Sequence, residues 1–81
     1  MPFIEMKLIE GELPEEKVGK FIEDLTNLVV SYIGENIRGV THIAIQEIKS
    51  GYWGAGGQAV GLDDIKALLA GTGTTEKAEE Y

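Results

Sequence analysis

Apolar residues recur at every second position near the start of the chain, between residues 3 and 10. One face of such a segment carries Ile4, Met6 and Leu8, and the other carries Phe3, Glu5, Lys7 and Ile9. A period of two is typical of a β-strand. The pattern therefore predicts a first strand that ends at Gly11.

The next segment repeats its apolar residues with the period of an α-helix. Pro14 suits a first helical position, and Glu15 and Glu16 suit the positive end of a helix dipole. The apolar positions that follow the i, i+3, i+4, i+7 rule are Val18, Phe21, Ile22, Leu25, Leu28, Val29, Tyr32 and Ile33. They predict a one-faced helix of roughly twenty residues. Gly34 is the expected C-terminal cap, and residues 35–39 are the expected return loop.

Residues 40–48 are rich in β-branched side chains and predict a second strand. Strand, long helix and strand form a βαβ unit, in which the two strands are parallel and the crossover is right-handed. One helix covers only one face of a two-stranded sheet, so Phe3 and Ile9 on the other face are expected to lack a cover. We therefore expect the sheet to be completed by oligomerisation.

The segment 51–57 places four glycines around Tyr52 and Trp53. It fits a tight hairpin whose glycines adopt positive φ. It also fits a phosphate-binding loop, although the GK[ST] ending and the following helix of such a loop are missing. Asp63 and Asp64 then begin a short predicted helix, which runs through Ile65, Leu68 and Leu69 and ends at Gly71. We interpret residues 1–71 as one domain and residues 72–81 as a flexible polar tail.

The composition excludes several kinds of site and partner. The 81 residues include no cysteine, which excludes disulfides and thiolate metal sites. The net charge is −7, and the basic residues form no cluster, so nucleic acid and anionic membrane are not expected partners. The sequence shows no signal peptide and no apolar run near the ~20 residues of a membrane helix. We expect a cytoplasmic protein that uses no metal and no cofactor.

Pro2 is the residue with the most distinctive potential chemistry. Methionine is normally removed before a small second residue, and removal of Met1 would leave Pro2 with a free secondary amine at the start of a strand. Such an amine titrates near the α-amino range of about 7.7–8.0, which suits a general acid–base catalyst. The plainer interpretation is that proline is a tolerated second residue.

Together these features resemble the 4-oxalocrotonate tautomerase family. The resemblance is carried by Pro2-Phe3-Ile4-Glu5, Ile9-Glu10-Gly11, Glu15-Glu16-Lys17 and Gly51-Tyr52-Trp53-Gly54-Ala55-Gly56-Gly57. It covers residues 2 to about 57. It implies an α+β fold with a single β-α-β unit and a C-terminal β-hairpin, assembled as a hexamer that is a trimer of dimers.

The resemblance also implies a reaction and its residues. In the family the N-terminal proline is the general base for keto–enol tautomerisation of a small unsaturated 2-oxo acid or enol. Two arginines bind the substrate carboxylate and polarise its carbonyl; the matching positions here are Glu12 and His42. Trp53 takes the place of the hairpin aromatic, which makes the pocket apolar and lowers the pKa of the proline amine. We expect Pro2 to be catalytic and His42, Trp53 and Arg38, the last swinging in from its loop, to bind substrate.

Three of the residues at or near the expected site also have a plainer interpretation. His42 fits a sheet surface at a subunit contact, Trp53 fits interface packing, and Glu12 fits a solvated loop. The two missing arginines also favour an alternative, in which the chain is a non-catalytic or accessory subunit of a hetero-oligomer with a paralogous chain. A related proline-dependent reaction, such as hydration with dehalogenation or decarboxylation, is a third possibility.

Overall fold

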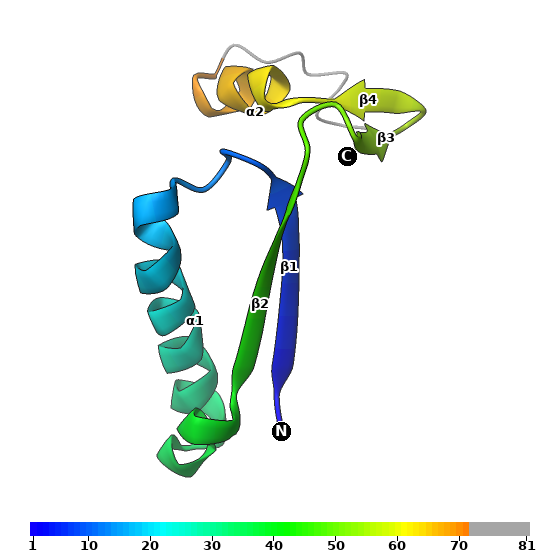
Figure 1. Cartoon of the computed structure of the whole chain (residues 1–81). Helices are drawn as coiled ribbons and strands as arrows, with labels where there is room; N and C mark the ends of the chain where they lie inside the picture. Colours follow the sequence, from blue (N-terminus) through cyan, green and yellow to red (C-terminus); the bar gives the residue numbers. More distant parts are fainter. Residues whose placement is uncertain (72–81) are drawn as a thin grey trace. The chain divides into compact units, whose positions relative to one another are not determined.

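The computed structural model describes residues 1–71, so the predicted tail at 72–81 lies outside the described residues. The described elements are β1 (Phe3–Ile9), η1 (Glu15–Lys17), α1 (Val18–Ile33), η2 (Glu35–Val40), β2 (His42–Ile48), β3 (Trp53–Ala55), β4 (Gln58–Val60) and α2 (Leu62–Leu69) (Figure 1). Here η1 and η2 are short 3-10 helices. The order confirms the predicted α+β fold with a β-α-β unit followed by a β-hairpin. Among these residues no helix is long and apolar enough to cross a bilayer.

β1 and β2 form a two-stranded sheet whose strands run in the same direction. At their starts the N–H of His42 donates to the carbonyl oxygen of Pro2 at 2.9 Å, and at their ends the N–H of Glu10 donates to the carbonyl of Ile48 at 2.8 Å. From the first bond to the second, the residue numbers rise in both strands, from 2 to 10 and from 42 to 48. The predicted parallel pairing is therefore confirmed.

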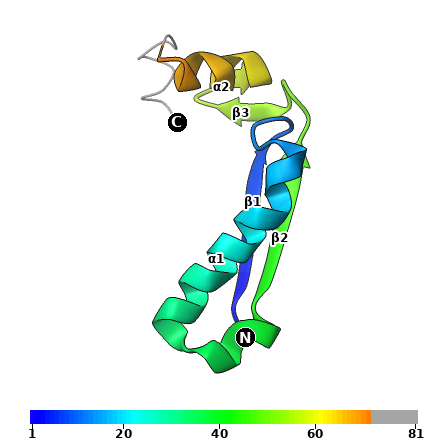
Figure 2. The ribbon, with the colours of Figure 1, turned by 90° about the vertical axis from the view of Figure 1, so that its left-hand side faces the viewer.

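The chain divides into two compact units, and the first contains Met1–Lys7 and Leu13–Gln46. Within this unit α1 lies along one face of the two strands (Figures 1 and 2). The helix presents a stripe of half-buried residues that includes Phe21, Ile22, Leu25 and Val29, but no residue of α1 is fully buried. Phe3 on β1 and Tyr32 on α1 are 65% and 86% exposed. This unit therefore leaves large apolar side chains uncovered in the single chain, as the pattern predicted for Phe3.

Two predicted boundaries in the first unit differ from the structure. The predicted helix start at Pro14 is a separate 3-10 turn, and the α-helix itself begins at Val18. The predicted return loop at 35–39 is the 3-10 helix η2, which delays the second strand to His42. Gly34 ends α1 with a φ of 132°, while its N–H still donates to the carbonyl of Val30. The tighter η2 helix has bonds between residues three apart: Ile37 N–H donates to the carbonyl of Gly34, and Thr41 N–H donates to the carbonyl of Arg38, both at 3.2 Å.

The second unit contains Leu8–Glu12 and, within the described chain, residues 47–71. Its hairpin pairs β3 with β4 in antiparallel register, with Trp53 opposite Val60. The turn residues Gly56 and Gly57 both have positive φ, at 59° and 81°, which matches the favoured two-residue hairpin turn. The hairpin interpretation of the glycine-rich segment is thus confirmed over the phosphate-loop alternative.

The only fully buried side chains among the described residues belong to this second unit. They are Leu8, Ile9 and Val60, each 2–3% exposed. The expectation that Ile9 lies on an uncovered face is therefore wrong, because residues that follow β2 complete a small core around the end of β1.

The predicted helix after Gly61 is confirmed as α2. Its start is fixed by Asp64, whose carboxylate accepts from Gly61 N–H, and by the Ser50 hydroxyl, which accepts from Leu62 N–H.

Candidate active site

Pro2 and His42 lie side by side at the start of the parallel sheet. The carbonyl of Pro2 accepts the 2.9 Å bond from His42 N–H, so the position of Pro2 is fixed from its carbonyl side. Its ring is half-buried, and Met1 before it is 86% exposed. In the chain with Met1 in place the Pro2 nitrogen is an amide without a basic lone pair. The structure therefore brings together two of the four predicted site residues.

The strand register decides which face His42 occupies. In a parallel ladder, a residue donates its N–H to the residue that precedes its register partner. His42 donates to Pro2, so its register partner is Phe3. Register partners point to the same face of the sheet. Both side chains are exposed, Phe3 at 65%. Ile43 next to His42 is half-buried, as expected for the opposite face. His42 is therefore an accessible imidazole beside an exposed aromatic ring, and an imidazole can donate a hydrogen bond or carry a positive charge.

The guanidinium of Arg38 is bonded to two other side chains. Its Nε donates to Glu35 Oε2 at 2.8 Å, one terminal nitrogen contacts Glu35 Oε1 at 3.4 Å, and the other donates to Asn27 Oδ1 at 2.8 Å. Arg38 lies in η2, its side chain is 44% exposed, and Asn27 belongs to α1. A movement of the guanidinium toward a substrate must break all three contacts.

Glu12, which stands where the resemblance expects a cation, is bonded to the end of β1. Its carboxylate accepts a 3.1 Å bond from the N–H of Ile9, and its own N–H donates to the Ile9 carbonyl at 2.9 Å. The intervening Gly11 has a φ of 87°, and its N–H donates to the Glu47 carboxylate at 3.3 Å. Glu12 therefore closes a turn, and its carboxylate adds negative charge there.

Trp53 lies on β3, in the second unit, and is half-buried. Its neighbour Tyr52 is 72% exposed and stacks under the ammonium of Lys49, which lies 5.0 Å from the ring centre. Trp53 is thus the less exposed of the two hairpin aromatics. Trp53 is predicted to approach the Pro2 of a neighbouring subunit, and this approach stays a prediction.

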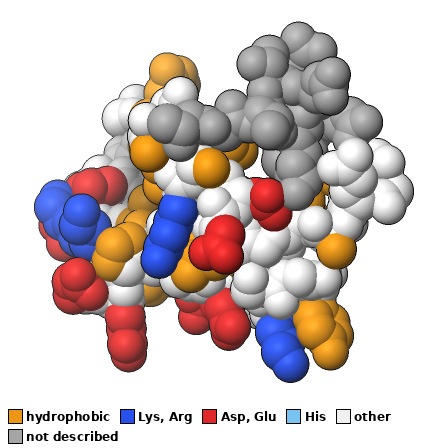
Figure 3. Space-filling model, turned by 90° about the horizontal axis from the view of Figure 1, so that it is seen from above, with side chains coloured by type: hydrophobic (Ala, Val, Ile, Leu, Met, Phe, Trp, Pro, Cys, Tyr) orange, Lys and Arg blue, Asp and Glu red, His pale blue; other side chains and the backbone are white. Residues whose placement is uncertain are grey.

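Two other described lysines are paired with acidic side chains. Lys7 pairs with Glu5 at 3.8 Å, and Lys20 pairs with Asp24, whose hydrogen bond and charge raise the pKa of the lysine. On the face drawn in Figure 3, acidic side chains are exposed among the basic ones. Within residues 1–71 no three histidine or carboxylate side chains come together as a metal site.

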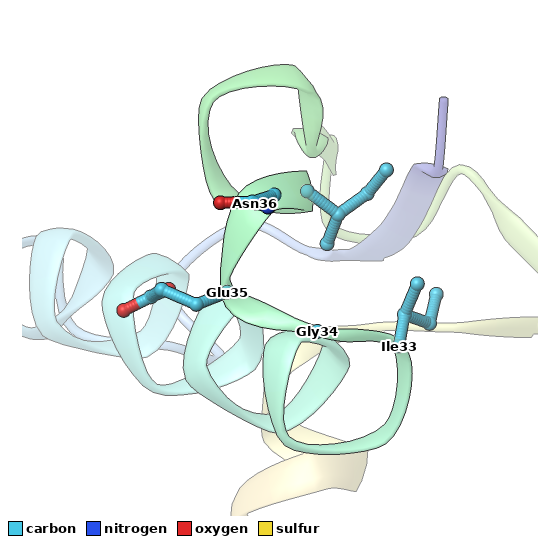
Figure 4. A pocket seen from close by; sticks show the side chains of 5 residues that line it. Ile33, Gly34, Glu35 and Asn36 are labelled. Carbon is cyan, nitrogen blue, oxygen red and sulfur yellow. The ribbon is translucent and has the colours of Figure 1, made fainter.

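One open hollow of about 340 Å³ lies at the turn between α1 and η2 and is lined by residues 33–37. Figure 4 shows the Glu35 carboxylate pointing away from Ile33. None of the four predicted site residues lines this hollow. It therefore does not contribute to the candidate active site.

The sequence reasoning did not identify Asn27 and Glu35, the partners of Arg38. Glu35 had a detectable signal, because an acid three residues before an arginine is a common helical pair. Asn27 had none, since it lies eleven positions away in the chain.

Comparisons with known proteins agree with this architecture. A family profile described as "Tautomerase enzyme" matches residues 2–63, six residues beyond the stretch that the motifs cover. "Probable tautomerase K2" from Dickeya dadantii (strain 3937) is 30% identical over 60 residues, which cover 74% of this chain and 88% of that protein. A crystal structure of a "putative 4-oxalocrotonate tautomerase" from methicillin-resistant Staphylococcus aureus matches with a TM-score of 0.61 and 29% identity. That match covers 72% of this chain and 90% of the other. With a profile match from Pro2 to the start of α2, this chain belongs to the tautomerase family.

Proposed function

We propose that this protein is a keto–enol tautomerase in which the amine of Pro2 is the general base. The observation that carries the proposal is the place of Pro2: it is the first residue of the family match and is bonded to His42 at the start of the sheet. Family membership supports a tautomerase-type isomerase. The identity of the base and the substrate are our own inference.

The proposed reaction moves one proton and changes no oxidation state. The neutral amine of Pro2 takes a proton from the enol oxygen, and the resulting ammonium returns a proton to carbon, giving the keto form. His42 stabilises the developing negative charge at the substrate carbonyl or carboxylate by donating a hydrogen bond, a contribution that is often large in such reactions. The sum is an isomerisation that needs no cofactor.

This mechanism requires that Met1 be removed. Only a terminal proline has a basic secondary amine, whereas the amide nitrogen of an internal proline cannot accept a proton. We therefore propose that the working form begins at Pro2. A cytoplasmic location, where such processing is common, stays a prediction.

The proposed substrate is a small enol or unsaturated 2-oxo acid with one carboxylate. Two features favour a monoanion: Glu12 is acidic where the resemblance expects an arginine, and the chain carries a net charge of −7. Trp53 of a neighbouring subunit is the proposed apolar wall of the pocket. Arg38 as a direct substrate contact stays a prediction that requires its guanidinium to leave Glu35 and Asn27.

The proposed working form is a homo-oligomer, most simply a hexamer. Large apolar side chains are exposed both on β1, at Phe3, and on α1, at Leu28, Tyr32 and Ile33. They support an assembly because association would remove their apolar area from water. The second candidate function is that of an accessory subunit in a hetero-oligomer with a paralogous chain. That candidate is favoured by the replacement of both expected arginines by Glu12 and His42.

Assay of the purified chain alone distinguishes the two candidates. We expect the Met1-free protein to convert phenylenolpyruvate to its keto form, and the Pro2→Ala protein to be much slower. Lack of turnover by the pure chain, together with activity after addition of a paralogous chain, would replace the enzyme proposal with the accessory one.

A further inference from the structure

We propose that Arg38 is a positioning residue, which fixes the η2 turn so that His42 meets Pro2 in the correct register. The proposal rests on the proposed function for its catalytic consequence. Its structural part, the control of the Pro2–His42 pair by Arg38, stands on the contacts alone. It differs from the prediction that Arg38 binds the substrate directly.

The guanidinium of Arg38 joins two elements. Two of its nitrogens contact the Glu35 carboxylate at the start of η2, and the third donates to Asn27 in the body of α1 at 2.8 Å. Isolated surface ion pairs contribute little, but a two-pronged arginine–carboxylate contact has defined geometry. The Asn27 bond is a tertiary link across eleven residues, so it anchors η2 to the helix before it.

Hydrogen bonds of Thr41 connect η2 to the residue before His42 in the chain. The carbonyl of Arg38 accepts a 3.2 Å bond from the N–H of Thr41, and the Thr41 hydroxyl donates to the carbonyl of Ile37 at 2.9 Å. The next residue is His42, whose N–H donates to Pro2. A continuous series of bonds therefore runs from α1 through Arg38 and Thr41 to the first rung of the β1–β2 ladder.

The position of η2 matters because only Thr41 separates its last residue, Val40, from the start of β2 at His42. The strand has a side-chain period of two, so a shift of one residue would carry the His42 imidazole to the other face of the sheet. Gly34 directly before η2 and Gly39 within it have no side chains to restrict the backbone. Arg38 supplies the side-chain contacts that hold the turn in place.

Amide hydrogen exchange at His42 tests the proposal without any activity measurement. Removal of the charged contacts in Arg38→Ala, or of the helix partner in Asn27→Ala, is expected to raise the exchange rate of the His42 amide about tenfold, the scale of one or two net hydrogen bonds. Arg38→Lys keeps the positive charge but cannot contact the Glu35 carboxylate through two nitrogens, so it should give an intermediate exchange rate. Lys20→Ala removes an exposed pair on the same helix and should leave the rate unchanged.

Kinetics separates positioning from direct substrate binding. A positioning role predicts that Arg38→Ala and Asn27→Ala lower kcat by similar factors, equally for enols with and without a carboxylate. The double variant should then have a kcat no lower than that of the slower single variant, because each single substitution already removes the same Arg38–Asn27 bond. A substrate-binding role instead predicts a raised KM for carboxylate substrates in Arg38→Ala alone, with Asn27→Ala unaffected.

Unchanged His42 exchange in Arg38→Ala and Asn27→Ala would overturn the proposal. Absence of tautomerase activity in the parent protein would overturn the proposed function but not the structural link, since the exchange measurement remains valid. If Arg38→Ala fails to fold, Asn27→Ala and Arg38→Lys still decide the question.

Discussion

His42 donates its backbone N–H to the carbonyl oxygen of Pro2 at 2.9 Å, and this bond forms the first rung of the parallel ladder between β1 and β2. The bond uses the carbonyl side of Pro2, so the proline nitrogen takes no part in the ladder. The candidate base and the candidate hydrogen-bond donor therefore begin the two strands together. Their juxtaposition depends on the register of the sheet.

The assembly state is the first prediction. The first unit has no fully buried residue, and Phe3 and Tyr32 are largely exposed in the single chain. We therefore expect light scattering to give a hexamer of the 8.8 kDa chain at micromolar concentration. A stable monomer under those conditions would contradict both the predicted assembly and the proposed contribution of a neighbouring Trp53.

Trp53 is expected to be buried between subunits. Replacement by alanine should weaken the assembly by ~3–5 kcal/mol per site, the usual cost of truncating a packed aromatic side chain. Sedimentation equilibrium of the two proteins measures the effect. Tyr52→Ala is the matched control, because Tyr52 is the adjacent aromatic residue and is 72% exposed. Equal assembly and melting of parent and Trp53→Ala would show that Trp53 is a surface residue.

Glu12 is expected to set the charge preference of the site. The parent should turn over monocarboxylate enols faster than dicarboxylates, and Glu12→Arg should improve dicarboxylate turnover mainly through KM. The carboxylate of Glu12 also accepts from Ile9 N–H, so the arginine variant should lose about 0.5–1.5 kcal/mol of stability to denaturant.

Glu12→Gln separates these two effects. Glutamine keeps an oxygen that can accept from Ile9 N–H but removes the negative charge, so we expect a smaller gain for dicarboxylates and almost no loss of stability. A parent enzyme that already prefers dicarboxylates would show that cations elsewhere, on Arg38 or on another chain, bind the second carboxylate.

The sequence predicted the elements of this fold better than their boundaries. The period of two in β1 and the helical period from Val18 to Ile33 are local patterns, and such patterns indicate the type of an element well. The 3-10 helix at 35–40 was missed, because its short-range bonds leave no apolar period in the sequence. Burial of Ile9 was also missed, since the end of β1 belongs to a compact unit whose other residues begin only at Glu47.

The site was predictable only in part for the same reason. Pro2, His42 and Trp53 were singled out from motif order. The βαβ topology predicted parallel strands but not the register that joins His42 to Pro2. The contact between Arg38 and Asn27 joins residues eleven positions apart, and composition or spacing carries no sign of it. Whether Trp53 approaches a Pro2 depends on other subunits and lies beyond any pattern in one chain.

The free amine of Pro2 is the central claim, and processing state tests it most directly. Two preparations of one chain are compared, one confirmed by intact mass to begin at Pro2 and one that retains Met1. The processed protein should convert phenylenolpyruvate with a kcat/KM that rises with pH as the amine loses its proton. Pro2→Ala should be slower by on the order of 10²-fold or more, the usual cost of losing a positioned general base. The Met1-retaining protein should be at least as impaired, because its Pro2 nitrogen is an amide. Equal rates for the processed and Met1-retaining proteins would contradict the account, and the accessory-subunit function would then be the better explanation.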